Sequence, residues 1–233
     1  MRIVMKISGE SLKKDNNITE SSLDKLYENI LEIKDNNEII IIPGGGNFWR
    51  GRNNLAINKV ISDQIGMLGT IMNALAISSY LTEKGISSTC YGAFEISGLI
   101  KKSNVNDVNK DLKEGKIIVL GGGLGVPNLS TDMTTVSKAI EYNADLILMS
   151  KNYNAIYDKD PKLSSANKIE KISHQELLNM SIKQGISSLT ILDLEALVEL
   201  AKHKTPMYVY NGAAIESIKE VLNGKKGTRV ITE

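Results

Sequence analysis

The chain has 233 residues, of which 42% are hydrophobic and 24% charged, as is ordinary for a soluble globular protein. Its formal net charge is +1 and it has no dense Lys/Arg cluster, so nucleic acid is not expected as its main partner. Its single cysteine, Cys90, excludes a disulfide framework or a cysteine-based metal site within the chain, and we expect a cytoplasmic protein.

Short β-branched runs alternate with helical stretches along the whole chain. The sequence predicts strands at residues 2–7, 39–42, 88–91, 116–120, 145–149, 207–210 and 228–231. It predicts helices at about residues 23–31, 59–84, 107–113, 132–142, 194–201 (capped near Thr190) and 213–222, and a surface loop at 153–167. No apolar run is expected to span a membrane, and the immediate first strand predicts no signal peptide. We therefore expect one domain over residues 1–233, a three-layer α/β/α sandwich with a largely parallel central sheet.

Three of these strands end in small-residue turns. Ile39 to Ile42 lead through Pro43 into Gly44, Gly45 and Gly46, and Arg50 follows shortly after. The same plan recurs at residues 116–125 and, with Lys6 before Ser8 and Gly9, at residues 2–10. Glycine turns expose peptide N–H groups that can cradle an anion, and arginine suits a phosphate. If the turns meet at one edge of the sheet, they form a site for two phosphorylated ligands.

Several familiar nucleotide and hydrolase signatures are missing. The sequence has no P-loop, no dinucleotide fingerprint, no protein-kinase signature and no metalloprotease motif. Its histidines, His174 and His203, lie in ordinary helical contexts and are expected to be surface or packed residues. The remaining glycines, lysines, arginine and aspartates suit phosphoryl transfer, which depends on positioning and charge stabilisation.

An ordered set of short motifs carries a resemblance to a known family. The set is Lys6 to Glu10 (KISGE), Gly44 to Gly51 (GGGNFWRG), Asp63 to Thr70 (DQIGMLGT), Thr131-Asp132, Asp160-Pro161, Leu192-Asp193-Leu194 and Gly227-Thr228. It resembles the bacterial uridylate (UMP) kinases of the amino acid kinase family over nearly the whole chain. The resemblance implies a carbamate kinase-like fold and ATP-dependent phosphorylation of UMP to UDP in pyrimidine nucleotide biosynthesis. It also implies that Mg²⁺ accompanies ATP, with no separate metal site, and that the subunits form a hexamer, a trimer of dimers.

The resemblance assigns residues to three roles. The implied catalytic residues are Lys6, Arg50, Asp132 and Asp193. The implied ATP-binding residues are Lys6, Ile7, Ser8, Gly9, Gly46, Arg50, Lys151, Tyr157 and Asp160. The implied UMP-binding residues are Gly45, Arg50, Asp63, Leu124, Gly125, Val126, Pro127, Asn128, Leu129, Ser130 and Thr131. From the residues alone, Asp63 is better explained as a helix-surface carboxylate, and Asp132 and Asp193 as helix N-caps, for which a dual role is plausible.

The chain departs from the family pattern in two places. Residues 124–129 read LGVPNL where the family has TGNPFF, and residues 149–155 place a lysine at Lys151, two positions after the usual one. The polar connection 13–17 is also shorter than in GTP-regulated members. Two other interpretations therefore stay open: a family member that phosphorylates a carboxylate or carbamate, and a nucleotide-binding regulatory or storage subunit without turnover.

Overall fold

The computed structural model describes residues 1–14, 17–51, 56–184 and 192–232, and contains a nine-stranded sheet. Its order is β11-β13-β12-β8-β1-β4-β7-β5-β6, and every pair except the antiparallel β12 and β13 is parallel. The strands are β1 (Arg2–Ile7), β4 (Glu38–Pro43), β5 (Ser88–Gly92), β6 (Lys101–Lys102), β7 (Ile117–Gly121), β8 (Leu146–Lys151), β11 (Lys171–Ser173), β12 (Met207–Asn211) and β13 (Thr228–Ile231).

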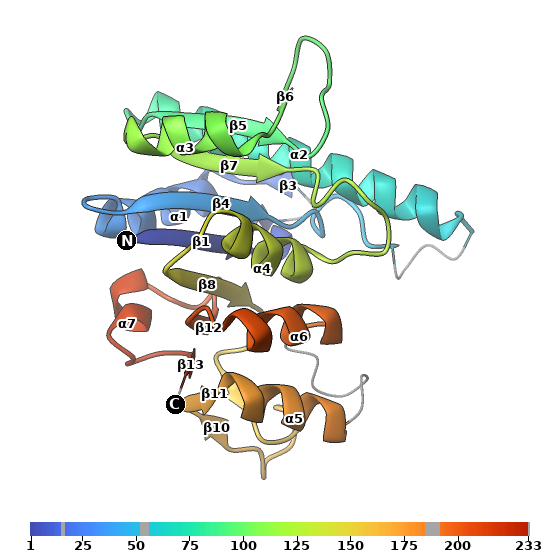
Figure 1. Cartoon of the computed structure of the whole chain (residues 1–233), viewed down its shortest axis with the longest axis vertical. Helices are drawn as coiled ribbons and strands as arrows, with labels where there is room; N and C mark the ends of the chain where they lie inside the picture. Colours follow the sequence, from blue (N-terminus) through green and yellow to red (C-terminus); the bar gives the residue numbers. More distant parts are fainter. Residues whose placement is uncertain (15–16, 52–55, 185–191, 233) are drawn as a thin grey trace.

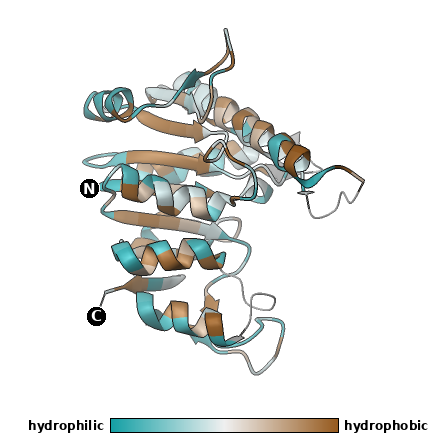
Figure 2. Cartoon of the chain, turned by 45° about the vertical axis from the view of Figure 1, so that its right-hand side comes forward, coloured by the Kyte–Doolittle hydropathy of each residue, from teal (hydrophilic) through white to brown (hydrophobic). Residues whose placement is uncertain are grey.

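Helices cover both faces of this sheet, so the predicted α/β/α sandwich is confirmed (Figure 1). One layer contains α1 (Glu20–Ile33), α2 (Lys59–Glu83) and α7 (Ile218–Leu222). The other contains α3 (Val105–Lys113), α4 (Thr131–Glu141), α5 (His174–Gln184) and α6 (Leu194–His203). Figure 2 shows hydrophobic strands between helices whose hydropathy alternates along their length. Such amphipathic helices bury one stripe and leave the other to water.

The continuous isoleucine run of β4 follows from burial on both faces. Ile40 and Ile42 lie in the core beneath α3 and α4, and Ile39 and Ile41 lie in the core beneath α1 and α2. All four side chains are at most 1% exposed. Burying each one contributes about 1.5–3 kcal/mol relative to exposure, so β4 is a firm support for the glycine turn at its end.

Several element boundaries differ from the sequence prediction. α5 was not predicted, and the expected loop 153–167 contains β9 (Ile156–Tyr157), which pairs with β10 (Lys168–Ile169). α7 begins at Ile218 rather than near residue 213, because the Ser217 side chain caps it by accepting a bond from the Lys219 N–H. The cap of α6 is Asp193, and Thr190 lies outside the described residues. Short strands β2 (Lys13–Lys14) and β3 (Asn17–Ile18) and a 3₁₀ turn at Gly9–Leu12 complete the described elements.

His174 is packed and His203 lies at the surface, as predicted. His174 is 5% exposed, and its Nε2 lies 2.9 Å from the Thr205 carbonyl oxygen. His203 lies at the end of α6, where its Nε2 is 3.5 Å from Glu199. Neither residue lines the cleft described below.

The expectation that no segment could span a membrane needs correction for α2. By length and composition alone α2 could cross a bilayer, since its most apolar window has a mean hydropathy of 1.4. One such helix is weak evidence, because the core helix of a soluble protein passes the same test. α2 packs against β5 and β7, and 44% of that window is buried within the protein.

The close contact between α2 and the end of β7 gives a stability test. A Cβ atom added at Gly121 would lie 2.8 Å from the Cα of Ile71, a distance that forces helix and strand apart. We expect Gly121→Ala to cost about 1–3 kcal/mol of unfolding free energy and to lower Tm by roughly 2–4 °C per kcal/mol. Gly66→Ala is the control, because its nearest neighbour would be 4.0 Å away and it should be neutral or stabilising. Equal melting temperatures for the two variants would contradict this packing.

Candidate active site

A cleft of about 710 Å³ opens at the carboxyl ends of adjacent strands. β8, β1, β4 and β7 are neighbours in that order, and the arrowheads of β4, β7 and β8 point to the same side in Figure 1. The three small-residue turns therefore meet at one edge, as predicted. The lining residues are Lys6, Ser8, Glu10, Gly45, Gly46, Trp49, Arg50, Gly51, Ser62, Asp63, Gly66, Met67, Thr70, Gly123, Leu129, Ser130, Thr131, Thr134, Lys151, Asn152, Tyr153, Ala155 and Val209.

Glycine is required where these turns touch one another. A Cβ atom on Gly9 would lie 2.7 Å from the backbone nitrogen of Gly46, so the turns after β1 and β4 pack backbone to backbone. A Cβ atom on Gly45 would lie 2.6 Å from the carbonyl oxygen of Gly66 in α2. Larger residues would separate the strand ends from α2 and widen the cleft. The glycines thus set the distance between the backbone of these turns and the side chains around it.

Asp132 lies outside the cleft lining and connects two lysines that line it. It lies in the first turn of α4, and its Oδ1 is 3.0 Å from the Nζ of Lys6 in β1. Its Oδ2 accepts a hydrogen bond from the Nζ of Lys151, the last residue of β8. The three side chains are 11–15% exposed, so these charges face the cleft from a mostly dry position. A carboxylate between two ammonium groups leaves a net positive charge suited to a phosphate.

Burial and charge act in opposite directions on these groups. Burial raises the pKa of Asp132, but the two ammonium groups outweigh it and hold the pKa below its ordinary value of 3.8. Burial lowers the pKa of Lys151 below 10.5, Asp132 partly opposes that shift, and Lys6 adds to it. Asp132 is therefore ionised at neutral pH, and its charge keeps the two lysines together.

Asp193 and Ser130 join the starts of two helices at the same place. The Ser130 hydroxyl donates to Asp193 Oδ2 and accepts from the Met133 N–H at 3.0 Å, which caps α4. Asp193 Oδ1 accepts from the Ala196 N–H at 2.9 Å and caps α6. The N-cap interpretation of Asp193 is confirmed, whereas for Asp132 the cap is Ser130. Both helix N-termini carry partial positive charge, which favours an anion nearby.

Arg50 is anchored to the glycine turn and to a glutamate that sequence analysis had assigned no role. Its Nε donates to the Gly46 carbonyl at 3.3 Å, and its Nη2 forms an ion pair with Glu10 Oε1. The other carboxylate oxygen of Glu10 accepts from the Asn152 side chain at 2.7 Å. Glu10 belongs to the KISGE motif, so its place directly after β1 was the available signal.

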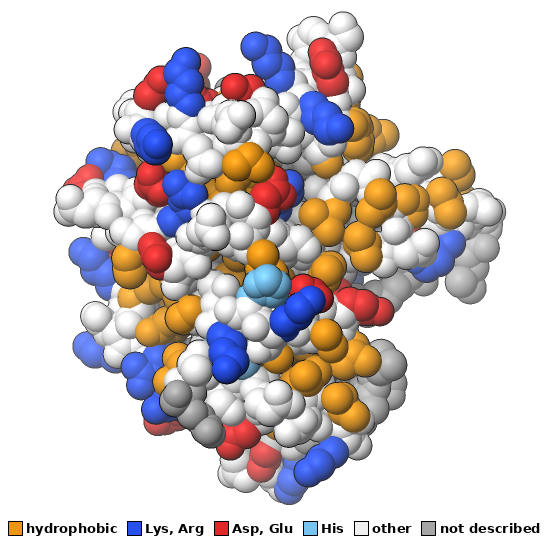
Figure 3. Space-filling model, in the orientation of Figure 1, with side chains coloured by type: hydrophobic (Ala, Val, Ile, Leu, Met, Phe, Trp, Pro, Cys, Tyr) orange, Lys and Arg blue, Asp and Glu red, His pale blue; other side chains and the backbone are white. Residues whose placement is uncertain are grey.

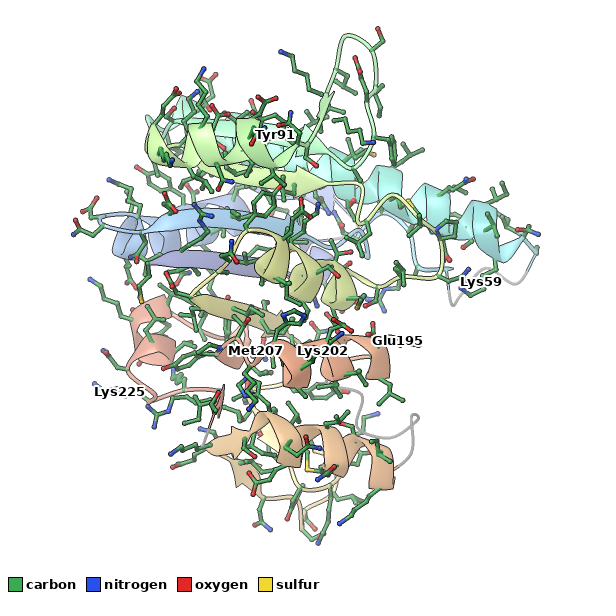
Figure 4. The ribbon with its side chains drawn as sticks, in the orientation of Figure 1. Lys59, Tyr91, Glu195, Lys202, Met207 and Lys225 are labelled. Atoms are coloured by element: carbon green, nitrogen blue, oxygen red, sulfur yellow. The ribbon has the colours of Figure 1, made fainter. Side chains whose placement is uncertain are left out.

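Asp63 connects α2 to the segment between β7 and α4. Its Oδ2 accepts from the backbone N–H of Asn128 at 2.8 Å and from Lys59 Nζ at 3.1 Å, and Lys59 also contacts Asn128 Oδ1. Lys59 projects from the outer end of α2, where Figure 4 labels it. Asn128 has φ +66°, a conformation that asparagine tolerates better than most residues. Asp63 is thus more than a solvated surface carboxylate.

Other predicted ligand-binding residues lie off the cleft surface. Of the predicted UMP segment, Leu129, Ser130 and Thr131 line the cleft, and residues 124–128 do not. On the ATP side, Tyr157 and Asp160 are outside the lining, whereas Tyr153 and Ala155 belong to it. Asp160 Oδ1 instead accepts from the Lys162 N–H at 3.0 Å. Ile7 is buried at 6% exposure and Gly9 is a packing residue, so their ligand roles, like those of the others, stay predictions.

The sequence matches the model of the Amino acid kinase family over residues 1–211. It is 32% identical over 237 residues to a uridylate kinase of Francisella tularensis subsp. holarctica, covering 98% of this chain and 92% of that protein. It is 35% identical over 236 residues to a uridylate kinase of Aster yellows witches'-broom phytoplasma, covering 97% and 95%. The chain therefore belongs to the amino acid kinase family, which confirms the resemblance seen in its motifs.

Solved structures agree with this assignment. The UMP kinase of Bacillus anthracis superposes with a TM-score of 0.90 at 28% identity, covering 100% of this chain and 96% of that one. The UMP kinase of Ureaplasma parvum gives a TM-score of 0.87 at 29% identity, covering 100% and 95%. The fold of this chain is thus that of solved UMP kinases.

The charge arrangement around Asp132 predicts a large stability effect. Asp132→Asn leaves Lys6 and Lys151 mostly buried without a counter-charge, which should cost about 3–5 kcal/mol. Adding Lys151→Met should restore part of the loss, because it removes one uncompensated ammonium group. The pKa of Asp132 is lowered in the folded state. The extra unfolding free energy of the wild type over Asp132→Asn should therefore be complete above about pH 4 and should shrink as the pH falls through that lowered pKa. Urea unfolding at several pH values measures this, and a loss below about 1 kcal/mol at pH 7 would contradict it.

Proposed function

We propose that this protein is a UMP kinase that transfers the γ-phosphoryl group of ATP to UMP, giving UDP and ADP. The observation that carries the proposal is the Lys6–Asp132–Lys151 arrangement beside the glycine turns, in the fold of solved UMP kinases. Relatives that cover nearly the whole chain are uridylate kinases. The product would supply pyrimidine nucleotide synthesis in the cytoplasm.

In this mechanism the protein positions two phosphates and neutralises charge. The acceptor phosphate is the nucleophile and is largely ionised at neutral pH, so no general base is needed. Lys6 and Lys151 stabilise charge on the transferred group, and Asp132 keeps both ammonium groups at the point of transfer. The N–H groups of Gly45 and Gly46 would separate and hold the donor and acceptor phosphates, with Ser8 on the donor side. Arg50 would hold the acceptor phosphate through its planar guanidinium group.

The acidic groups present fit a metal that arrives with ATP. Among the described residues, no group of three or more His, Cys, Asp or Glu side chains could hold a metal by itself. Asp132 is already engaged by two lysines, and Asp193 by Ser130 and the α6 backbone. Mg²⁺ usually keeps several waters and is bound through one or two carboxylates plus substrate phosphates. Bound to ATP, it would neutralise phosphate charge, and Glu10 and Asp63 are the carboxylates that line the cleft.

Uracil recognition would depend on the backbone of residues 124–131. The family threonine, asparagine and phenylalanines are replaced here by Leu124, Val126, Asn128 and Leu129, so side-chain hydrogen bonds to the base are reduced. Peptide groups of the segment are still available, and two hydrogen bonds to α2 hold the backbone just before it and in its middle. The Gly122 N–H donates to Thr70 Oγ1 at 2.7 Å, and the Asn128 N–H donates to Asp63.

A coupled assay of ADP formation with ATP, Mg²⁺ and each nucleoside monophosphate tests the proposal. We expect turnover with UMP at a kcat/KM well above that for CMP, AMP or GMP. Turnover with carbamate or an acyl carboxylate instead would favour the second enzymatic interpretation. Binding of UMP without turnover of any acceptor would favour a regulatory or storage subunit.

Arg50 is expected to act on the transition state more than on folding. Its side chain is 46% exposed in the cleft, so Arg50→Ala should leave Tm nearly unchanged. Loss of a charge-stabilising donor should cost about 2–4 kcal/mol of transition-state stabilisation, which lowers kcat/KM roughly 30- to 1000-fold. Arg2→Ala serves as the comparison, because Arg2 forms an ion pair at the opposite end of β1. Near wild-type activity in Arg50→Ala would reject the assignment.

Asp63 is expected to act on the acceptor alone. An ionised carboxylate accepts charge-assisted hydrogen bonds from ribose hydroxyls and from the Asn128 N–H, and an amide accepts fewer and weaker ones. Asp63→Asn should therefore raise KM for UMP about tenfold and leave KM for ATP unchanged. Steady-state kinetics with each substrate varied in turn gives both constants. Equal increases in the two constants would show a general structural role instead.

An exposed apolar face of α2 supports self-association. Ile61, Leu68 and Met72 follow helical spacing and are 46–50% exposed, and Figure 3 shows hydrophobic side chains gathered over this helix. A large exposed apolar surface marks an interaction site, and a helix face can pair with its own copy about a two-fold axis. We therefore propose a homodimer through α2, which is the unit from which a hexamer would be built.

A charge placed in that face should break the contact. Leu68→Glu should shift the molar mass measured by light scattering toward the 25.5 kDa monomer. Ile182→Glu is the matched control, because Ile182 is also apolar and exposed (58%, against 46% for Leu68) but lies on α5 on the other side of the sheet. An unchanged oligomer in Leu68→Glu, or a monomeric wild type, would refute the α2 contact.

A further inference from the structure

Glu10 joins the two halves of the cleft through one carboxylate. It lies in the 3₁₀ turn directly after β1, the strand between β8 and β4. Its Oε1 forms an ion pair with Arg50, which follows β4 in the chain. Its Oε2 accepts a hydrogen bond at 2.7 Å from the side chain of Asn152, the residue directly after β8. Each oxygen thus holds a side chain from a different neighbouring strand end.

The turn that carries Glu10 is itself braced. The Glu10 N–H donates to Ser8 Oγ at 3.3 Å, and the Ser11 N–H donates to the Ser8 carbonyl at 3.0 Å. The Glu10 side chain is 30% exposed, so its charge is only partly screened by water. A carboxylate on a braced turn is a fixed support for the more mobile arginine side chain.

Asn152 extends this support to the donor side. The Asn211 side chain in β12 donates to the Asn152 carbonyl at 3.5 Å and to Asn154 Oδ1 at 3.1 Å. Asn152 is also the residue after Lys151, whose ammonium group contacts Asp132. A change at Glu10 therefore reaches the Arg50 guanidinium group directly and the position of Lys151 through one peptide unit.

We propose that Glu10 is a positioning residue that orients Arg50 for the acceptor phosphate and couples it to the donor-side segment through Asn152. This inference rests on the proposed kinase function. Glu10 does not touch the reacting atoms in this account; it fixes the Nε–Nη2 edge of the Arg50 guanidinium group together with the Gly46 carbonyl. An oriented arginine loses less freedom when it binds phosphate, so both acceptor affinity and turnover benefit.

The test compares Glu10→Gln, Asn152→Ala and the double variant in steady-state kinetics with each nucleotide varied. Glu10→Gln keeps the size of the side chain and removes its charge, and we expect kcat/KM for UMP to fall about tenfold. Asn152→Ala should raise KM for ATP about threefold and leave KM for UMP unchanged. Both changes break the same hydrogen bond between Glu10 and Asn152. The rise in KM for ATP in the double variant should therefore be no larger than the rise in Glu10→Gln alone.

Glu38→Gln is the matched control, because Glu38 forms an arginine ion pair at the opposite end of the same strands, 2.7 Å from Arg2 Nε. It should keep wild-type kinetics. Kinetics of Glu10→Gln that match this control would overturn the proposal, as would fully additive losses in the double variant. A lower KM for UMP in Glu10→Gln would also overturn it, since Glu10 would then compete with phosphate for Arg50.

Calorimetry separates this inference from the proposed function. If the wild type turns over no nucleoside monophosphate, the kinase proposal fails, and binding of UMP to wild type and Glu10→Gln decides the role of Glu10. At least severalfold weaker UMP binding in Glu10→Gln supports positioning of Arg50. Equal affinities, or no UMP binding by either protein, would overturn it.

Discussion

The contact of Asp132 with Lys6 and Lys151 is the constraint on which the cleft depends. The three residues come from α4, β1 and β8, so the carboxylate fixes the ends of two strands against the start of a helix. Without it, two mostly buried ammonium groups would repel one another and the cleft would open. The same arrangement leaves excess positive charge where phosphate is proposed to bind, so one interaction serves both the fold and the chemistry.

Much of the architecture could be predicted because it follows from local pattern. The isoleucine run of β4 could be buried only on both faces, and the turns after β1, β4 and β7 had to meet once these strands were parallel neighbours. α5 and the Glu10–Arg50 contact could not be predicted in this way. α5 is as long as α4, but its amphipathic pattern is weaker than those of α3, α4 and α6. The Glu10–Arg50 contact depends on side-chain positions 40 residues apart.

The displaced lysine of β8 has a simple structural explanation. Met149, at the usual family position, is fully buried in the core between the sheet and α4. Side chains alternate between the two faces of a strand, so Lys151, two residues further along, lies on the same face as Met149. Lys151 is the last residue of β8, and its ammonium group there contacts Asp132. The sequence pattern alone indicated the shared face but could not show that the strand end reaches the carboxylate. The predicted donor residues Tyr157 and Asp160, by contrast, lie outside the cleft lining.

The most direct test of this account is the affinity of a non-hydrolysable ATP analogue for the wild type and for Lys151→Met, measured by calorimetry with Mg²⁺. If Lys151 and Lys6 share the donor phosphates, the wild type binds one analogue per subunit, and Lys151→Met binds it about tenfold or more weakly with its fold intact. Absence of binding to the folded wild type, or equal affinity of the two proteins, would contradict the assignment of Lys6, Asp132 and Lys151 as the phosphate-transfer centre.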